Sequence, residues 1–375
     1  MKILLLLEDY DKSYTKACHE EKSFKQLPYK KAEKFLYSKG IYYGNSYLKA
    51  FKRANWQAYQ IIPSCLDLQL KWFKENRKYI WLLYCIVNAP LWRLKKKARL
   101  ETAHKILFEQ IKEIRPDILF VHSYSIELKQ KYLERLRPYA KKIVLWYSCQ
   151  ISNSFPYKSF DLIFSCIPNL VKHFKKMGIC SQLIPHSFDP DFSEAWKTSQ
   201  ARQQRVIFAG SLSQFHTDRI ALFSYLSKKH VPIDFFVKGK DFLQNSEAKI
   251  KTCNLSLWGY DLYKAYASYL LTIHCDIDVA KNGSLAKRLF EATGMGICVL
   301  ANDSELIRDY FIPDEEIVLY ASPEECLEKV RWLLKNPERA IEIGRNGQRR
   351  TLKDHTCANR VDKMVQEFSK IFDLK

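Results

Sequence analysis

The sequence predicts an α/β protein with two Rossmann-like domains, each a parallel sheet covered by helices. Short, continuous apolar runs alternate with longer amphipathic stretches along the 375 residues. Such runs are typical of parallel strands that are buried on both faces. At about 100–200 residues per domain, the length corresponds to two domains. A hydrophobic content of 47% is sufficient for two packed cores.

The apolar runs form two sets of five predicted strands. The first set comprises residues 3–7, 59–62, 118–121, 143–147 and 162–164. The second set comprises residues 206–209, 233–237, 271–274, 297–300 and 317–320. The intervals between them predict the covering helices. In such folds ligands bind at the ends of the strands, so we expect the site there and in the cleft between the domains.

The domain boundary is expected within residues 189–205, which contain Pro190 and a polar run. We therefore predict an N-terminal domain of residues 1–190 and a C-terminal domain of residues 191–355. Residues 356–375 are expected to form a helix that packs back on the N-terminal domain. The stretch 359–372 places apolar side chains on one helical face: Val361, Met364, Val365, Phe368 and Phe372.

The formal net charge of +20 is concentrated in the first half of the chain. Residues 1–190 carry 34 Lys and Arg but only 16 Asp and Glu, whereas the rest of the chain carries 27 and 25. A cationic half indicates an anionic partner, such as a membrane surface, nucleic acid or a phosphorylated substrate. Nucleic acid is not expected, because the aromatic residues lie in apolar runs rather than in a basic groove.

Several function classes are disfavoured by missing motifs. The 11 cysteines are scattered without a CxxC pair, so neither a disulfide framework nor a zinc site is expected, and a reducing, cytoplasmic compartment fits better. The sequence has no GxGxxG, GxxxxGK, HExxH or GxSxG motif. Asp276 and Asp278 form a lone DxD, which we interpret as two ordinary acids at a strand end, and no metal site is expected.

Two segments of the second half carry groups that suit a nucleotide. The strand that ends in Gly210 and Ser211 is followed by Arg219, and a strand that leads into a helix N-terminus is an anion-binding arrangement. Farther along, residues 284–292 are expected to be helical, which would put Lys287, Arg288 and Glu291 within about one turn. Cations suit a diphosphate, and a carboxylate suits ribose hydroxyls.

These segments resemble those of the GT-B glycosyltransferases, in the branch related to the spore-maturation CgeB-like proteins. The resemblance rests on the order and spacing of several elements and covers about residues 55–365. One departure is that the first acid of a Glu-x7-Glu pair is replaced by Gly283. The matching elements are residues 68–72, 115–122, 160–165, 184–189, 206–219, 284–296 and 355–360.

The resemblance implies transfer of a sugar from a nucleotide diphosphate sugar to a glycan or lipid-linked acceptor, with retention at the anomeric centre and without a metal or other cofactor. The N-terminal domain would hold the acceptor and the C-terminal domain the donor. Arg219 and Arg288 are assigned to stabilising the leaving diphosphate. His122 would bind the acceptor or a donor hydroxyl, or else it is a structural histidine.

The remaining assignments concern donor binding and domain closure. His186 is interpreted as structural, whereas His355 and Arg360 are expected to close the two domains. The residues assigned to donor binding are Gly210, Ser211, Lys238, Gly239, Trp258, Gly259, Lys287 and Glu291.

Residues 79–92 are apolar and aromatic, and basic residues flank them on both sides. Fourteen residues are too few to span a bilayer as a helix, since about 20 are needed. They either lie in the membrane interface with the basic flank on anionic lipid or form a buried helix beside a solvated basic loop. In the first case residues 76–99 would bind the inner face of the cytoplasmic membrane.

Two alternative functions remain open from the sequence. A nucleotide-sugar 2-epimerase on the same fold would keep the donor site but would need acid and base groups instead of an acceptor groove. A non-catalytic protein that binds anionic membrane surfaces would not depend on Glu291.

Overall fold

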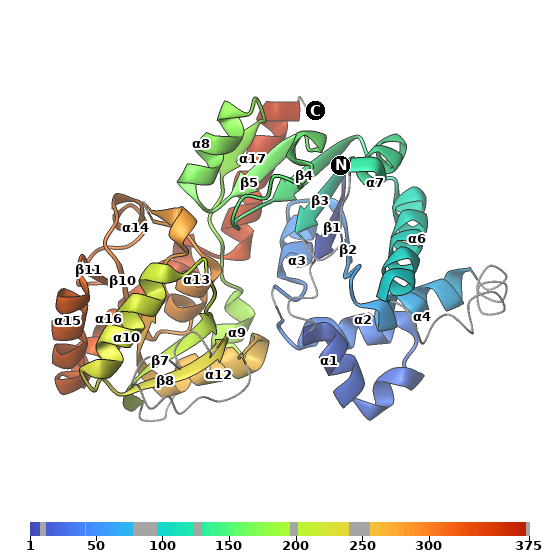
Figure 1. Cartoon of the computed structure of the whole chain (residues 1–375). Coiled ribbons are helices and arrows are strands. Elements are labelled where there is room, and N and C mark those ends of the chain that lie inside the picture. Colours follow the sequence, from blue (N-terminus) through green and yellow to red (C-terminus); the bar gives the residue numbers. More distant parts are fainter. Residues whose placement is uncertain are drawn as a thin grey trace. The chain divides into compact units, whose positions relative to one another are not determined.

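The computed structural model describes residues 1–7, 13–41, 43–77, 96–122, 130–195, 202–239, 256–281 and 283–372. The chain divides into two compact units, each with one parallel sheet (Figure 1). The first unit comprises residues 1–147, 152–164 and 174–181, and the second comprises residues 148–151, 165–173 and 182–375. The predicted class, α/β with two Rossmann-like domains, is confirmed.

The first sheet has the strand order β2-β1-β3-β4-β5-β6. Its central strand β1 is parallel to both neighbours, with Ile3 opposite Ala58 and Ile118. Nearly every side chain of β1 and β3 is buried, because helices cover both faces of the sheet. The strands are β1 (Lys2–Leu7), β2 (Gln57–Ile61), β3 (Ile118–His122), β4 (Lys142–Trp146), β5 (Leu162–Ser165) and β6 (Ser181–Leu183).

The helices associated with the first sheet connect successive strands. They are α1 (Ser13–Glu20), α2 (Tyr29–Ser38), α3 (Ser46–Arg53), α4 (Leu66–Asn76), α6 (Lys96–Ile114), α7 (Gln130–Leu136) and α8 (Pro168–Lys176). Short 3-10 turns cover Lys22–Gln26, Arg137–Tyr139 and Tyr157–Ser159.

The second sheet has the strand order β11-β10-β9-β7-β8, and all its neighbouring strands are parallel. Strand β9 is buried along its whole length, as expected of a central strand in a parallel sheet. The strands are β7 (Gln203–Ser211), β8 (Ile233–Lys238), β9 (Tyr269–His274), β10 (Cys298–Asn302) and β11 (Val318–Tyr320).

The helices of the second unit end in a long pair, α16 and α17. A proline at the first position of α16 supplies a backbone angle that already suits a helix start. The helices are α9 (Pro190–Ala195), α10 (Thr217–Lys228), α12 (Gly259–Ser268), α13 (Lys287–Gly294), α14 (Glu305–Arg308), α15 (Pro323–Lys335), α16 (Pro337–Asp354) and α17 (Cys357–Phe372). A 3-10 turn covers Asp278–Ala280.

All ten predicted apolar runs form strands, with ends that differ by a few residues. Strand β6 was not predicted, because this three-residue strand contains Ser181 and Gln182 and has no apolar run. The predicted face of the last helix is confirmed for Val361, Met364 and Phe368, which are fully buried. Packing of this helix on the N-terminal domain stays a prediction.

The segment 184–189 is fastened to the start of α17 within the second unit. Phe188 forms a parallel bridge with Thr356. The Arg360 guanidinium donates from Nε to the His186 carbonyl oxygen at 3.0 Å. His186 is 8% exposed, in keeping with the structural role predicted for it. Arg360 therefore holds two distant parts of the chain together inside one unit.

Among the described residues, no helix combines the length and apolar character that crossing a membrane requires. The apolar segment 79–92 lies entirely outside the described residues, as do most side chains of its basic flanks, so the membrane assignment of residues 76–99 stays a prediction.

Candidate functional site

Three helices of the second unit begin at the carboxyl edge of its sheet. Helices α10, α12 and α13 follow β7, β8 and β9 respectively, so their N-termini lie at the edge where those strands end. Helix N-termini present unpaired N–H groups and the positive end of the helix dipole. This edge is also where open α/β sheets bind ligands.

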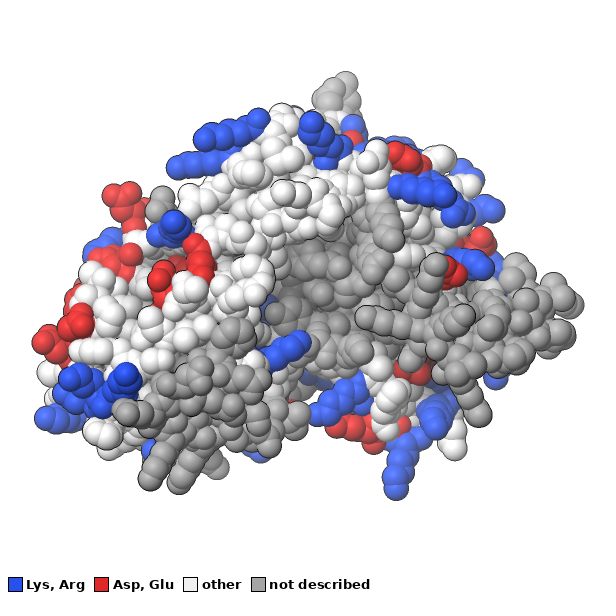
Figure 2. All heavy atoms as spheres, in the orientation of Figure 1, with Lys and Arg blue, Asp and Glu red and all other residues white. Residues whose placement is uncertain are grey.

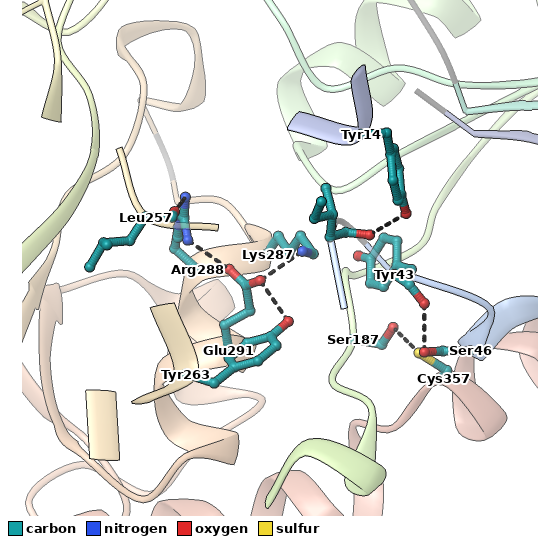
Figure 3. A network of polar contacts seen from close by, with 11 residues as sticks. Tyr14, Tyr43, Ser46, Ser187, Leu257, Tyr263, Lys287, Arg288, Glu291 and Cys357 are labelled. Atoms are coloured by element: carbon teal, nitrogen blue, oxygen red, sulfur yellow. Dashed lines mark hydrogen bonds and ion pairs between the residues drawn. The ribbon is translucent and has the colours of Figure 1, made fainter. Parts of the chain in front are cut away.

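A buried ion cluster lies at the start of α13. Glu291 is 2% exposed, and its Oε1 accepts hydrogen bonds from Lys287 Nζ at 2.7 Å and from the Tyr263 hydroxyl at 3.0 Å. Its Oε2 accepts one from an Arg288 guanidinium nitrogen at 3.3 Å. Figure 3 shows the carboxylate enclosed by these three side chains. The predicted grouping of Lys287, Arg288 and Glu291 within one helical turn is confirmed.

The cluster determines the charges of its members. Burial alone would raise the pKa of Glu291, but the charges of Lys287 and Arg288 outweigh it and hold that pKa below its usual value. Burial lowers the pKa of Lys287, and the nearby Glu291 opposes that effect. The carboxylate is therefore ionised at neutral pH and keeps two cations at the helix start.

Trp258 lies beside the Glu291 cluster, in contact with Arg288. The Arg288 guanidinium lies 4.7 Å from the centre of the Trp258 ring, and it is 3.5 Å from the Leu257 carbonyl oxygen. Trp258 is half-buried and is followed by Gly259, which begins α12 with a φ of +55°. Glycine adopts such a backbone angle at the least cost, because it has no Cβ. The structure thus brings two predicted base-binding residues against a predicted diphosphate-binding residue.

Arg219 lies at the ends of β7 and β9, where it is bonded to backbone. Its guanidinium donates to the Ser211 carbonyl oxygen at 2.9 Å and to the Cys275 carbonyl oxygen from Nε at 3.1 Å. Burial lowers the pKa of Arg219, yet a guanidinium stays charged in proteins. Arg219 therefore fixes the carboxyl ends of two neighbouring strands, and its catalytic role stays a prediction.

Gly210, Ser211, Lys238 and Gly239 lie together at the same edge. Gly210 is opposite Val237 and Ser211 is opposite Lys238 in the β7–β8 pair. Gly239 follows with a φ of +83°. The predicted residues of this group are therefore adjacent in space at the end of two paired strands.

The two acids of the DxD have separate structural partners. Asp276 accepts hydrogen bonds from the Ser284 hydroxyl and from His274. Asp278 accepts one from the backbone N–H of Thr217, the first residue of α10. Asp276 thereby links the end of β9 to the segment that leads into α13, and Asp278 caps α10.

Gly283 shows why the first acid of the pair is missing. Its φ is +94°, and an added Cβ would lie 2.5 Å from the Ser304 hydroxyl oxygen. A side chain there would be strained by its backbone angle and by contact with Ser304. In this chain the position is built for glycine.

His122 lies at the end of β3 in the first unit. It is 2% exposed and is packed among the aromatic rings of Tyr43, Tyr47, Phe120 and Trp146. This environment fits the structural interpretation, and its role toward a ligand stays a prediction.

Tyr263 is a residue of this cluster that was not predicted from the sequence. Its hydroxyl donates to Glu291 from the neighbouring helix α12, and its side chain is fully buried. The available signal was its position four residues after Gly259, about one helical turn from a predicted ligand-binding start.

A comparison with protein families finds that residues 221–366 match the family described as "Glycosyl transferase-like". The match lies in the second unit and includes the Glu291 cluster. No curated protein sequence matches the chain.

Solved structures share the fold at low sequence identity. A glycosyltransferase from Rickettsia africae has 12% identity and a TM-score of 0.52, covering 100% of this chain and 99% of its own. Anabaena Alr3699/HepE in complex with UDP-glucose has 14% identity and a TM-score of 0.51, covering 72% and 82%. Sucrose-phosphate synthase from Thermosynechococcus elongatus has 11% identity and a TM-score of 0.51, covering 75% and 80%.

The fold is that of the GT-B glycosyltransferases. Over residues 221–366 the chain is similar to the glycosyl transferase-like family, and this match together with the fold indicates an enzyme of the glycosyltransferase class.

Proposed function

We propose that the protein transfers a sugar from a nucleotide diphosphate sugar to a glycan or lipid-linked acceptor. The observation that carries this proposal is the buried Lys287–Glu291–Arg288 cluster with Trp258 beside it. It lies at helix starts on the carboxyl edge of the sheet, within the glycosyl transferase-like segment. Among proteins of similar fold, Anabaena Alr3699/HepE was solved with UDP-glucose, which supports a nucleotide sugar as the donor.

The proposed binding mode follows from the free acceptor capacity of Glu291. Among the described residues, its Oε1 accepts two hydrogen bonds and its Oε2 accepts one. An ionised carboxylate has about four acceptor positions, so Oε2 retains one for a ribose hydroxyl. Lys287 and Arg288 would face the diphosphate, and Trp258 would lie beside the base.

The chemistry consists mainly of leaving-group stabilisation. Negative charge builds on the diphosphate as the glycosidic bond breaks, and fixed cations stabilise that charge in the transition state. We assign this task to Arg288 with Lys287, and to Arg219 through its position at the strand ends. With such cations the reaction is proposed to need no metal, and retention is proposed from the resemblance to the CgeB-like branch.

The acceptor is proposed to be held by the N-terminal domain at the inner face of the cytoplasmic membrane. The support is the charge of residues 1–190, with 34 Lys and Arg against 16 Asp and Glu. On α8, Lys172, Lys175 and Lys176 are exposed, and Figure 2 shows basic side chains gathered over this helix.

The test is thermal stabilisation by UDP, GDP, dTDP and CDP, each with magnesium and with EDTA. We expect one nucleotide to raise the melting temperature in both conditions, since a ligand at 100 times its Kd adds about 2.7 kcal/mol to the free energy of unfolding. Glu291→Gln should lose this response. Glu328→Gln, on the exposed face of α15, is the matched control and should keep it.

Glu291→Gln leaves Lys287 buried without its partner, so Arg288→Gln serves as a second variant that preserves the Lys287–Glu291 pair. A wild-type protein that responds to none of the four nucleotides would contradict the proposal. Conversion of UDP-GlcNAc without an acceptor into its 2-epimer would identify an epimerase instead.

A further inference from the structure

The second sheet reverses its strand order between β7 and β9. From β7 the chain passes to β8 on one side, and β9 lies on the other side of β7, followed by β10 and β11. In open α/β sheets ligands bind outside the carboxyl ends of the strands at such a reversal. Arg219 lies at this point, because its guanidinium donates to the carbonyl oxygens of Ser211, which ends β7, and Cys275, which follows β9. The reversal is therefore where we expect a ligand of this unit.

Asp276 places a carboxylate at the same point, directly after Cys275. Its Oδ1 accepts a hydrogen bond from the Ser284 hydroxyl and another from His274 Nε2 at 3.2 Å. Within the described part of the chain, its Oδ2 accepts none. The Asp276 side chain is 12% exposed, and its Oδ2 is not enclosed, unlike the unpartnered Oδ1 of Asp278. A ligand can therefore reach Asp276 Oδ2.

The carboxylate of Asp276 is fixed before a ligand arrives. Its two partners are buried, with Ser284 2% and His274 8% exposed. The backbone N–H of Asp276 donates to the side-chain oxygen of Asn302, the last residue of β10, at 3.2 Å. These contacts use only Oδ1 and the backbone, so they leave the second oxygen available. A binding group that is already held in place loses little freedom when a ligand binds.

The surroundings of Asp276 indicate which ligand group its Oδ2 accepts. Burial lowers the pKa of Arg219, and the charge of Asp276 is among those that oppose this effect. The nearby guanidinium disfavours a cation, and the carboxylate itself repels a phosphate. Among the described residues, no group of three or more His, Cys, Asp or Glu side chains is placed to hold a metal ion. A hydroxyl group fits, because it is neutral and its hydrogen bond to a carboxylate is charge-assisted.

Asp276 is near enough to the Glu291 cluster for one nucleotide sugar to reach both. Its partner Ser284 is three residues before Lys287, so those two Cα atoms are at most about 11 Å apart. The proposed donor places its ribose at Glu291 and its diphosphate at Lys287 and Arg288. The sugar is attached to the far end of the diphosphate, and none of these three residues is assigned to it. The sugar is therefore the part of the donor that suits Asp276.

We propose that Asp276 binds a hydroxyl group of the donor sugar through Oδ2, and that its charge selects neutral sugars over uronic acids. A uronic acid brings a second carboxylate to a site that already holds one, and such a repulsive element is an effective source of specificity. The inference rests on the proposed function, because it assigns the sugar end of the same donor.

The experiment is calorimetric titration with three ligands that share the nucleotide found to stabilise the protein. They are the nucleoside diphosphate alone, its conjugate with a neutral hexose and its conjugate with the matching uronic acid. For UDP these are UDP, UDP-glucose and UDP-glucuronic acid, and for GDP they are GDP, GDP-mannose and GDP-mannuronic acid. We expect the wild-type protein to bind the neutral conjugate at least about tenfold more tightly than the uronic acid conjugate.

Asp276→Asn removes the charge and keeps an oxygen for Ser284 and His274. We expect it to bind the neutral conjugate about tenfold more weakly, because a hydrogen bond to a charged group is lost. It should also lose the preference for the neutral conjugate. Its affinity for the nucleoside diphosphate alone should be unchanged, which a merely structural role of Asp276 does not predict and which shows that the variant is folded.

Two further variants complete the set. Asp362→Asn, on the exposed face of α17, is the matched control and should keep the wild-type preference. Asp276→Ser keeps a hydroxyl beside Ser284 and serves if Asp276→Asn does not fold. It should behave as Asp276→Asn does.

Three results would overturn the inference. These are equal affinity of the wild-type protein for the neutral and uronic acid conjugates, an unchanged preference in a folded Asp276 variant, and binding of the neutral conjugate that requires magnesium only when Asp276 is present. In each case binding of the nucleoside diphosphate would leave the proposed function standing. A wild-type protein that binds no nucleotide would contradict both.

Discussion

At the scale of single residues, His355 has a defined protonation state. The Arg360 guanidinium lies 3.2 Å from its Nδ1, and since Arg can only donate, Nδ1 is the acceptor. Its Nε2 then carries the proton and donates to the Tyr310 carbonyl oxygen at 3.2 Å. Burial, together with the charge of Arg360, lowers the pKa of His355 to about 4. The folded protein therefore holds this imidazole neutral.

This environment predicts acid sensitivity. As the pH falls below about 6.5, the unfolded chain takes up a proton on His355 before the folded chain does. The contribution of the neutral His355 to the free energy of unfolding is therefore fully present above about pH 6.5, and it is lost as the pH falls toward about 4. The expected loss is on the order of 3 kcal/mol, which urea unfolding at pH 7, 6, 5 and 4.5 would measure.

The variant His355→Asn keeps an acceptor without a titrating ring, and it should flatten the pH dependence relative to wild type. His230→Asn is the matched control, since His230 is exposed and adopts a left-handed backbone angle that Asn tolerates. An identical pH profile for His355→Asn and wild type would disprove the assignment.

At the scale of elements, α16 approaches β10 through glycine. An added Cβ at Gly344 would lie 2.5 Å from the Gly296 carbonyl oxygen and 3.0 Å from the Cys298 backbone nitrogen. These are backbone atoms and cannot move aside as a flexible side chain would. The glycine thus sets the distance between this helix and the sheet.

Replacing glycine by alanine usually stabilises a helix, but at Gly344 we expect the contact with backbone atoms to make this change destabilising. Gly→Ala in an exposed helix interior gains about 1 kcal/mol, whereas Gly344→Ala should destabilise the protein by about 1–3 kcal/mol through overpacking. Arg345→Ala, on the exposed face of α16, should change the free energy of unfolding by no more than about 0.5 kcal/mol. Urea unfolding of both variants measures the difference. A stabilising Gly344→Ala would show that the helix is free to move outward.

At the scale of the whole molecule, the charge asymmetry predicts binding to anionic membranes. Each basic residue near such a surface contributes about 1 kcal/mol, and the attraction falls within a Debye length of about 10 Å at 0.1 M salt. The protein should sediment with phosphatidylglycerol vesicles at 0.05 M NaCl and be released at 0.5 M. Neutral phosphatidylcholine vesicles should not bind it.

The predicted basic flank can be tested separately. Lys95→Gln, Lys96→Gln and Lys97→Gln combined should weaken vesicle binding at least about tenfold. The control combines Lys228→Gln, Lys229→Gln and Lys335→Gln, which remove the same charge from the second unit. Equal losses in the two triple variants would show that net charge matters and that residues 76–99 have no special role.

The sequence was sufficient for most of the fold because apolar runs are a local signal. A buried parallel strand must be apolar along its length, and the ten runs that meet this condition all form strands. Strand β6 does not meet this condition and was not predicted. Its buried Ser181 donates a hydrogen bond from its hydroxyl to the Ile163 carbonyl oxygen, so a polar residue can occupy the strand. Strand order carries no such local signal.

The candidate site was predictable where its residues share one helical turn. Lys287, Arg288 and Glu291 are three and four residues apart, which helix geometry alone brings together. The contacts of Glu291 with Tyr263 and of Arg288 with Trp258 join α13 to α12 and to the residue before α12. The spacing of Tyr263 from Gly259 places it near the site, but no spacing in the sequence predicts which residues of the two segments pair.

The sequence by itself determined the class, the strands and the local groups of the site, because each follows from the periodicity of neighbouring residues. Only the tertiary structure decided that the Arg219 guanidinium is bonded to two strand ends, that Gly283 faces Ser304, and that Asn302 accepts a hydrogen bond from the backbone N–H of Asp276. These contacts join residues far apart in the chain, so they depend on which elements become neighbours in the folded sheet.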